Sequence, residues 1–381
     1  MTDGSNTTGI YIHIPFCASR CPYCDFYSVL TDAHADAFTD AAADELRTLR
    51  RCAPFAGDIK ERDIATVYFG GGTPSYIGAQ RLSFLLGEVG KNFRIAQNAE
   101  ITVECNPSSS LSDGFFDRLR EAGFNRVSMG MQSAVDTERR KLGRLSGAAD
   151  VEKAVSACQK AGFDNISLDV MLGVPEQTEE SLHRTLAFAD SLGVQHISAY
   201  MLSLEEGTFF YRKRASLGLP DEDAVCELYL SACEALAQMG YRHYEISNFC
   251  KEGFASRHNT AYWKCGEYLG TGPAAHSFIN GKRFYYERDL DGFLAGAPAV
   301  YDCEGGGAEE YIMLGLRLDT GVSLGEIKKK YGISPKDVLF RRLKKYAENG
   351  LAVFDGDRIA LTEKGFLLSN TLIGEITGDF I

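Results

Sequence analysis

Short apolar runs alternate with longer amphipathic stretches through the first 200 residues. Runs of strand length are bounded by turn residues, whereas the stretches between them show the 3.6-residue period of helices. This alternation predicts βαβ units and a parallel sheet. Six such units with polar residues at the strand ends indicate an α/β fold of the TIM type, closed or partial, whose sites lie at the C-terminal rim. The predicted strands are 10–14, 66–69, 100–104, 126–131, 167–171 and 196–202, and the predicted helices are 33–51, 79–92, 112–122, 149–161 and 179–192.

The first predicted strand shows which of its faces is polar. Tyr11 and His13 share one face, and the three isoleucines at 10, 12 and 14 share the other, because successive side chains of a strand point in opposite directions. We expect Tyr11 and His13 to face the barrel interior. For His13, a hydrogen-bonded core histidine and a cofactor contact both remain open.

The chain leaves this repeat after residue 202. Residues 204–224 are predicted to be loop and turn, 224–239 a helix and 241–247 a strand. From about residue 305, three helices and a hairpin with a turn at Gly356 have the outline of a winged helix. The predicted division is a core barrel at 1–240, a barrel extension at 241–304 and a winged-helix-like domain at 305–381. That last domain carries 11 basic and 11 acidic residues, which favours a lid or an interaction surface over DNA binding.

Three cysteines follow the first predicted strand. Cys17, Cys21 and Cys24 are spaced C-x3-C-x2-C. A structural zinc site would need a fourth protein ligand, and ferredoxin-type clusters use four cysteines at other spacings. Three thiolates with one vacant position suit a [4Fe–4S] cluster whose fourth iron binds a non-protein ligand. The alternative is three small buried apolar residues, since free cysteine often has that role.

Polar residues also mark the ends of later strands. A glycine run at 70–72 lets the backbone approach a ligand closely, although a tight turn would explain it equally well. An arginine beyond the fourth strand can bind a carboxylate through two nitrogens, and a carboxylate within the fifth strand needs partners if it is buried. For Glu104 the alternative is a salt bridge at the rim, and for Arg144 it is a solvated position on the surface. The candidates are Gly71, Gly72, Thr73, Glu104, Gln132, Arg144 and Asp169.

Taken together, these motifs resemble the radical S-adenosylmethionine (SAM) superfamily. The segments E-x-N-P at 104–107 and N-x3-D-x-M-x-G-x-P-x-Q-T, which ends at Thr178, are similar to its coproporphyrinogen-oxidase-like branch. The resemblance implies a (β/α)6 partial barrel and a [4Fe–4S] cluster on Cys17, Cys21 and Cys24. In that superfamily the open iron chelates SAM, and the reduced cluster cleaves it to a 5′-deoxyadenosyl radical. The resemblance further implies SAM contacts from Tyr11, Tyr23, Gly71, Gly72, Thr73, Glu104, Gln132, Arg144 and Asp169.

Composition narrows the class of protein. The chain has 381 residues, 45% of them hydrophobic, and a formal net charge of −12, which argues against a general nucleic-acid-binding surface. It contains no apolar run of about 18 residues. The segment 1–9 lacks the basic-then-apolar pattern of a signal peptide. Eleven cysteines in a chain without an export signal indicate a reducing compartment, so we expect a cytoplasmic protein.

The segment 257–263 contains a further motif, H-N-x-x-Y-W, made of His258, Asn259, Tyr262 and Trp263. The residues alone favour a capped helix start that packs two aromatic rings. The motif is similar, however, to one found in the heme chaperones of this branch. That resemblance implies heme binding, with His258 ligating the iron and the aromatic residues covering the macrocycle.

Two functions compete in this branch. Oxygen-independent coproporphyrinogen III dehydrogenases carry one more cysteine two positions after the last cluster cysteine, and a longer N-terminal arm. Here that position is Phe26, and only nine residues precede the first predicted strand. We therefore expect a heme chaperone without coproporphyrinogen dehydrogenase activity. A radical SAM methyltransferase that opens the heme macrocycle ranks third.

The resemblance also implies partners. We expect heme as cargo, recipient hemoproteins and a reductant of the flavodoxin or ferredoxin type, but no nucleic acid. The sequence leaves open whether the chain forms a homo-oligomer, whether SAM is cleaved and which hemoprotein receives the heme.

Overall fold

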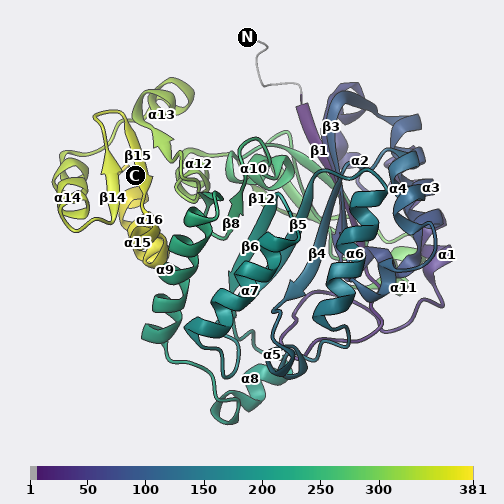
Figure 1. The fold of residues 1–381 in the computed structure, drawn as a ribbon. Coiled ribbons are helices and arrows are strands. Elements are labelled where there is room, and N and C mark those ends of the chain that lie inside the picture. Colours follow the sequence, from purple (N-terminus) through teal and green to yellow (C-terminus); the bar gives the residue numbers. More distant parts are fainter. Residues whose placement is uncertain (1–6, 381) are drawn as a thin grey trace.

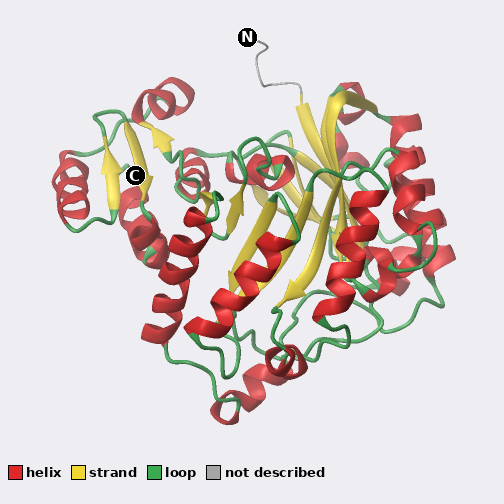
Figure 2. Cartoon of the chain, viewed as in Figure 1, coloured by secondary structure: helices red, strands yellow, loops and turns green. Residues whose placement is uncertain are grey.

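The computed structural model describes residues 7–380, and its centre is a twelve-stranded sheet (Figures 1 and 2). Six consecutive parallel strands form the middle of the sheet in sequence order, and helices cover its outer face, so the sheet is an open barrel. The six strands are β1 (Thr7–Ile14), β2 (Asp63–Gly71), β3 (Arg94–Cys105), β4 (Arg126–Gln132), β5 (Ile166–Leu172) and β6 (His196–Met201). The connecting helices are α1 (Ala35–Thr48), α2 (Ala53–Ala56), α3 (Ala79–Asn92), α4 (Phe115–Ala122), α5 (Asp136–Lys141), α6 (Ala148–Lys160) and α7 (Glu179–Ser191).

All six predicted strands and the five predicted helices of the barrel are therefore confirmed. The structure corrects the prediction for 204–224, which is not loop throughout, because α8 (Phe209–Lys213) forms there. The Thr208 hydroxyl accepts a hydrogen bond from the Tyr211 amide at 3.2 Å, and Phe210 is only 2% exposed. A helix this short depends on the burial of Phe210 rather than on local propensity.

The two faces of the central strands differ in polarity. Val127, Met129 and Met131 on β4 are fully buried on the outer face, which packs against the helices. The alternate positions face inward, where Arg126 pairs in register with Thr102 of β3. The expected orientation of β1 is observed too, since Tyr11 lies beside Tyr68 with ring centroids 6.1 Å apart. The interior of this barrel is consequently polar, whereas its outer face forms the main apolar core.

The predicted extension, 241–304, lies on both edges of the sheet. Its first part pairs with β6, and its last part begins with a strand that pairs parallel to β1. A short helix, α10, crosses from one edge to the other. The elements, with the helix that precedes them, are α9 (Glu222–Gln238), β7 (Arg242–Glu245), β8 (Asn248–Cys250), α10 (Arg257–Trp263), β9 (Tyr268–Thr271), β10 (His276–Ile279), β11 (Lys282–Tyr285), α11 (Leu290–Leu294) and β12 (Val300–Glu304).

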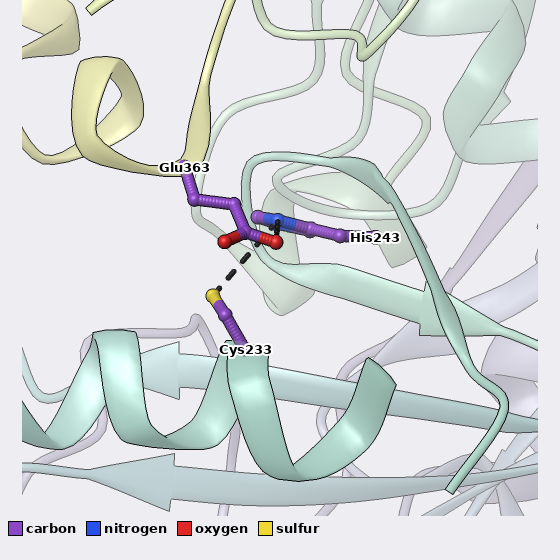
Figure 3. A group of neighbouring side chains, drawn as sticks. All are labelled: Cys233, His243 and Glu363. Atoms are coloured by element: carbon purple, nitrogen blue, oxygen red, sulfur yellow. Dashed lines mark hydrogen bonds and ion pairs between the residues drawn. The ribbon is translucent and has the colours of Figure 1, made fainter. Parts of the chain in front are cut away.

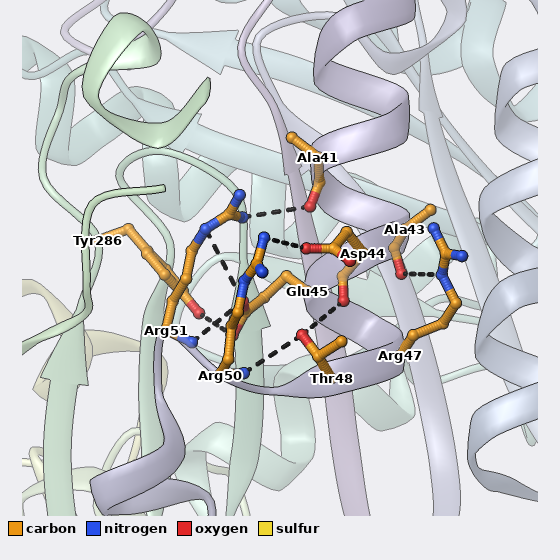
Figure 4. A network of polar contacts seen from close by, with 9 residues as sticks. All are labelled: Ala41, Ala43, Asp44, Glu45, Arg47, Thr48, Arg50, Arg51 and Tyr286. Atoms are coloured by element: carbon orange, nitrogen blue, oxygen red, sulfur yellow. Dashed lines mark hydrogen bonds and ion pairs between the residues drawn. The ribbon is translucent and has the colours of Figure 1, made fainter. Parts of the chain in front are cut away.

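A polar network fixes the β1 edge of this extension to α1 (Figure 4). The Tyr286 hydroxyl donates to the Glu45 carboxylate at 3.0 Å, and the backbone N–H of Arg51 donates to the same carboxylate at 3.3 Å. The Arg51 carbonyl in turn accepts from the Ala299 amide at 2.9 Å. Because Glu45 is buried, these partners satisfy a charge that would otherwise be costly to remove from water.

The C-terminal part is a smaller α+β unit packed beside α9 (Figure 1). Its three strands pair in the order β13-β15-β14, with the helix and hairpin order predicted for a winged helix. Two further helices, α15 and α16, were not predicted. No helix in the described part of the chain is long and apolar enough to cross a membrane. The elements are α12 (Ala308–Gly315), β13 (Val322–Ser323), α13 (Leu324–Tyr331), α14 (Asp337–Glu348), β14 (Ala352–Phe354), β15 (Arg358–Leu361), α15 (Glu363–Leu367) and α16 (Ser369–Gly378). The expectation about a signal peptide falls mainly on residues 1–6, outside the described residues.

Candidate functional site

The loop that carries the three cysteines is fixed to the end of β1. The Cys17 amide donates to the Val29 carbonyl at 3.0 Å, and the Val29 amide donates to the Pro15 carbonyl at 2.7 Å. Within the loop the Cys24 amide donates to the Cys21 carbonyl at 3.1 Å. Cys17, Cys21 and Cys24 are all unpaired thiols of intermediate exposure. The loop therefore holds three sulfur donors at the C-terminal end of β1.

The three sulfur atoms are spaced more widely than the ligands of a single ion. Burial, followed by the nearby Cys21 and Cys17, raises the pKa of Cys24 above its ordinary value, which places the three thiols in one group. Yet the three sulfur atoms do not all lie within 4.8 Å of one another, as the ligands of one tetrahedral ion would. Thiolates on three separate corners of a [4Fe–4S] cluster stand farther apart, so the donor set fits that group.

The glycine segment after β2 lies directly against this loop. The Gly72 amide donates to the Ile14 carbonyl and the Thr73 amide to the Phe16 carbonyl, both at 2.8 Å. The Thr73 hydroxyl lies 3.3 Å from the Cys17 sulfur. A Cβ on Gly72 would come within 2.8 Å of the Phe16 carbonyl oxygen, so only glycine allows this approach. Gly71, Gly72 and Thr73 thus lie together with the cysteines.

Glu104 lies near the end of β3 and holds the glycine segment in place. Its carboxylate accepts from the Tyr68 hydroxyl at 2.7 Å and from the Gly71 amide at 3.2 Å. Burial raises the pKa of Glu104 to about 7. Gly71 has a φ of +114°, a conformation that glycine adopts without strain. The site therefore contains a carboxyl group that changes its charge near neutral pH.

Arg144, in the loop after α5, reaches the cysteine loop, and Gln132 is the last residue of β4. Arg144 donates through Nη2 to the Gly130 carbonyl at 2.7 Å, and its Nη1 lies 3.6 Å from the Cys21 sulfur. Among the described residues, the buried Arg144 Nε has no hydrogen-bond partner. Gln132 has a φ of +70°, which is unusual for a residue with a side chain. A free guanidinium donor beside three thiols is what an anionic ligand of the cluster would need.

The remaining candidates line the barrel interior or its rim. Asp169 on β5 accepts from the Ser128 hydroxyl at 3.4 Å, and burial raises its pKa. The Tyr11 hydroxyl lies 3.1 Å from His13 Nδ1. Burial lowers the pKa of His13 to about 4, so this imidazole is neutral at pH 7. Tyr23, inside the cysteine loop, packs edge-on against Phe210 with ring centroids 6.1 Å apart.

An arginine that was not among the predicted site residues lies inside the barrel. Arg126, at the start of β4, is only 2% exposed, and its strongest charge partner is Glu100 of β3. Arg126, Ser128, Gly130 and Gln132 alternate with Val127, Met129 and Met131 along β4. This period-2 pattern marks the polar side as the interior and would have identified Arg126 as a buried cation.

The H-N-x-x-Y-W motif lies at the opposite end of the barrel from the cysteines. Its helix, α10, starts where the Glu100 carboxylate accepts from the amides of Arg257 at 2.9 Å and His258 at 3.0 Å. Ser256 caps the helix by accepting from the Asn259 amide at 3.4 Å, as the residues alone suggested. The contact between His258 of α10 and Thr66, in the first half of β2, places α10 at the end of the sheet where β2 begins. Figure 1 shows α10 at this end, remote from α5 and α8.

Both ring nitrogens of His258 have partners in this structure. Nδ1 lies 2.7 Å from the Thr66 hydroxyl, and Nε2 lies 2.8 Å from the Tyr262 hydroxyl. His258 is only 2% exposed, and burial lowers its pKa to about 3. Trp263, at the end of the motif, lies under the Arg317 guanidinium at 5.4 Å. The motif therefore closes one end of the barrel and connects it to the C-terminal domain.

A second histidine lies at the same end of the barrel as the cysteines. His276 opens β10 directly after the turn at 272–275, and a Cβ on Gly272 would come within 2.4 Å of the His13 carbonyl oxygen at the end of β1. The His276 ring is exposed and stacks on Tyr285 with centroids 5.3 Å apart. Its position in the fold depends on the β9–β10 turn, which local sequence patterns do not reveal.

Comparisons with known proteins agree with this geometry. Residues 11–189 match the radical SAM superfamily, and residues 308–368 match the HemN C-terminal domain. The structure is similar to that of coproporphyrinogen III oxidase (HemN) from Escherichia coli, with a TM-score of 0.82 over 98% of this chain and 90% of that one, at 23% identity. This likeness establishes the fold.

Three relatives match over nearly the full length. The heme chaperone HemW of Mycobacterium tuberculosis is 34% identical over 97% of this chain and 95% of that protein. HemW of Bacillus subtilis is also 34% identical, over 97% and 99%. HemW of Escherichia coli is 32% identical over 96% of both chains. The chain thus belongs to the radical SAM superfamily and, within it, to the family of the heme chaperone HemW.

Proposed function

We propose that this chain is a radical SAM-type iron–sulfur protein that binds heme and transfers it to recipient hemoproteins. The observation that carries the proposal is the similarity to heme chaperones across both domains, at 34% identity over 97% of the chain. Phe26 supports it, because related dehydrogenases have a thiol at that position. The alternative function is that of a coproporphyrinogen III dehydrogenase. The fold shared with coproporphyrinogen III oxidase supports this alternative only by showing that the two proteins are related.

The cysteine loop is proposed to hold a [4Fe–4S] cluster on Cys17, Cys21 and Cys24, with SAM on the open iron. When bound, this pair supplies one-electron reductive cleavage of SAM. The chain's own residues bind and orient SAM. Arg144 Nε is available to the carboxylate of SAM, the carbonyls at Gly71 and Gly72 to its ammonium, and the carboxylates of Glu104 and Asp169 to its hydroxyl groups. Thr73, Gln132, Tyr11 and Tyr23 complete the proposed set of contacts.

The rim around this loop carries exposed apolar side chains suited to a large flat cargo. Phe26 and Leu30 in the cysteine loop are 71% and 56% exposed, and Leu145, beyond β4, is 86% exposed. Tyr200 and Met201, at the end of β6, are exposed as well. Exposed apolar side chains that gather on one face of a protein mark a binding site for a ligand or a partner. The heme macrocycle is apolar over both faces, so we place heme at this rim.

Two histidines compete as ligand of the heme iron. The assignment of His258 stays a prediction, and it requires α10 to move, because the ring is buried and both nitrogens are hydrogen-bonded. His276 offers a neutral imidazole at the rim without such a movement, since partial burial lowers its pKa. The motif residues Asn259, Tyr262 and Trp263 would contact heme only if His258 is the ligand.

The test separates heme binding from porphyrinogen chemistry. The anaerobically reconstituted chain is titrated with heme, and in parallel it is incubated with coproporphyrinogen III, SAM and a flavodoxin-type reductant. We expect a shifted Soret band that saturates with heme and no consumption of the porphyrinogen. Decarboxylation at rates typical of enzymes, or heme binding no tighter than to an unrelated protein, would contradict the proposal. The cytoplasmic location and the reductant stay predictions.

A further inference from the structure

A cysteine, a histidine and a glutamate converge where the C-terminal domain meets the barrel. Cys233 comes from α9, His243 from β7 and Glu363 from the first position of α15, and their side chains point toward one another (Figure 3). The sulfur, Nδ1 and a carboxylate oxygen all lie within 4.8 Å of one another. None of the three belongs to the segment that matches the radical SAM superfamily, so this group is separate from the cysteine loop.

The distances suit one small metal ion. His243 Nδ1 lies 4.0 Å from the Cys233 sulfur and 4.0 Å from Glu363 Oε1, and the third side of this triangle is at most 4.8 Å. The centre of such a triangle lies about 2.5 Å or less from every corner. Zinc binds sulfur at about 2.3 Å and nitrogen or oxygen at about 2.0–2.2 Å. Movements of a few tenths of an ångström would bring all three ligands into range.

Hydrogen bonds among the three groups do not account for the arrangement. A separation of 4.0 Å between His243 Nδ1 and the Glu363 oxygen is too long for a hydrogen bond. The contact between Nδ1 and the Cys233 sulfur, also 4.0 Å, is at the limit even for sulfur. Three groups that can donate electron pairs therefore face a common point without satisfying one another. A cation at that point would be bound by all three.

The imidazole of His243 is already oriented for this role. Its Nε2 lies 3.5 Å from the Tyr229 hydroxyl, which itself donates to the Ile246 carbonyl at 3.2 Å. The ring stacks on Phe249 with centroids 4.2 Å apart and meets the edge of Phe366 at 5.3 Å. With Nε2 protonated toward Tyr229, the lone pair is on Nδ1, the nitrogen that lies 4.0 Å from both the Cys233 sulfur and Glu363 Oε1. Metal-binding histidines are generally held by such a partner on the second nitrogen.

Burial and charge favour zinc over other common ions. Cys233 is buried, whereas the Glu363 side chain is 49% exposed, so one side of the group is open to an entering ion and to a water as fourth ligand. One thiolate and one carboxylate neutralise a divalent ion. A set of sulfur, nitrogen and oxygen donors suits zinc, whereas magnesium and calcium take oxygen ligands.

We propose that Cys233, His243 and Glu363 bind one Zn²⁺ ion that ties the C-terminal domain to the barrel. On binding, the Cys233 thiol loses its proton to solvent, and a sulfur–zinc bond forms with no change in oxidation state. Because Glu363 lies within the HemN C-terminal domain match while the other two ligands lie on α9 and β7, the ion would fasten the two units together.

The experiment measures zinc in the cluster-loaded chain, so that the cysteine loop is already occupied by iron. After equilibration with zinc chloride and gel filtration, we expect about one zinc per chain by elemental analysis, in addition to iron. Glu363→Gln and Cys233→Ser should each weaken zinc binding at least about tenfold. Cys226→Ser is the matched control, because Cys226 lies two turns earlier on the same helix and outside the group. It should bind zinc as the unchanged chain does.

Thermal unfolding gives a second readout. Zinc should raise the unfolding midpoint of the unchanged chain and of Cys226→Ser, but not that of Glu363→Gln, since an ion that binds only the folded state stabilises it. Glu363 is exposed, so this variant decides the question even where Cys233→Ser fails to fold. Failure of the unchanged chain to retain zinc, or equal retention by Glu363→Gln, would overturn the proposal. Neither result bears on heme binding, which the proposed function concerns.

Discussion

Arg144 extends from the loop after α5 to the cysteine loop, where its Nη1 lies 3.6 Å from the Cys21 sulfur. A second donor of the same guanidinium, Nη2, is fixed by the Gly130 carbonyl at 2.7 Å. The guanidinium is thereby held with its Nε free of partners among the described residues. One side chain thus connects the thiols with the place where we position the carboxylate of SAM.

The first prediction concerns this arginine. Arg144→Lys should raise the dissociation constant of SAM by about 10- to 100-fold, because a hydrogen bond to a charged group contributes about 1.5–3 kcal/mol and lysine lacks the planar fork. Isothermal titration of the cluster-loaded chain under anaerobic conditions measures the change. Arg140→Lys, an exposed position on α5, is the control. Equal SAM affinity in both variants would remove Arg144 from the site.

The second prediction concerns the cluster itself. Cys17→Ser, Cys21→Ser and Cys24→Ser should each abolish stable incorporation of the cluster, because each removes one of only three thiolate ligands. Iron and acid-labile sulfide, measured after anaerobic reconstitution, should fall to background together with the brown colour. Cys303→Ser, an exposed cysteine on β12, should incorporate iron normally. Full iron content in any one of the three variants would show that its cysteine is not a ligand.

The third prediction concerns pH. Burial raises the pKa of Glu104 to about 7, from an ordinary value of 4.5. Between these values the folded state holds a proton that the unfolded state has lost, so stability falls as pH rises from about 4.5 to 7 and stays reduced above that. Glu104→Gln removes this penalty. In the cluster-free chain at pH 8, the variant should gain up to about 3 kcal/mol in free energy of unfolding.

Denaturant unfolding at several pH values checks this expectation. The gain from Glu104→Gln should shrink toward zero at pH 4.5, while SAM binding by the cluster-loaded variant should weaken. Glu245, whose pKa burial also raises to about 7, lies outside the proposed site, and Glu245→Gln should therefore leave SAM binding unchanged. A pH-independent effect of Glu104→Gln on stability would mean that the carboxyl group is charged throughout.

The fourth prediction distinguishes the two histidines. His276→Ala should weaken heme binding at least about tenfold and change the Soret maximum, because the exposed ring can reach iron without rearrangement. His258→Ala should instead destabilise the fold by about 2–3 kcal/mol, since the buried hydroxyls of Thr66 and Tyr262 lose their partner. Absorption spectra of the heme-loaded variants and denaturant midpoints give the two readouts. A changed Soret maximum in a well-folded His258→Ala, with none in His276→Ala, would show that His258 is the ligand.

The sequence predicts those features that depend on short stretches of chain. The three cysteines lie within eight residues, and the glycine segment directly follows β2, so spacing alone brings them to one rim. The period-2 pattern of β1 correctly orients Tyr11 and His13, because strand geometry fixes which side chains share a face.

What the sequence does not predict depends on pairings between distant segments. The extension divides between the two edges of the sheet because β9 pairs with β1 while β8 pairs with β6, and nothing local encodes that choice. The same holds for α10, whose place at the closed end of the barrel depends on Glu100 and Thr66, more than 150 positions earlier. The sequence therefore reveals the H-N-x-x-Y-W motif but does not reveal how far the motif lies from the cysteine loop.

The most direct test of the account is heme transfer. The cluster-loaded chain is loaded with one equivalent of heme, freed of excess by gel filtration and mixed with a heme-free acceptor hemoprotein of distinct Soret spectrum. We expect the acceptor spectrum to appear as the spectrum of the loaded chain disappears, and to do so faster than with serum albumin loaded in the same way. Heme that stays on the chain, or that leaves no faster than from albumin, would contradict the proposal that this protein is a heme chaperone.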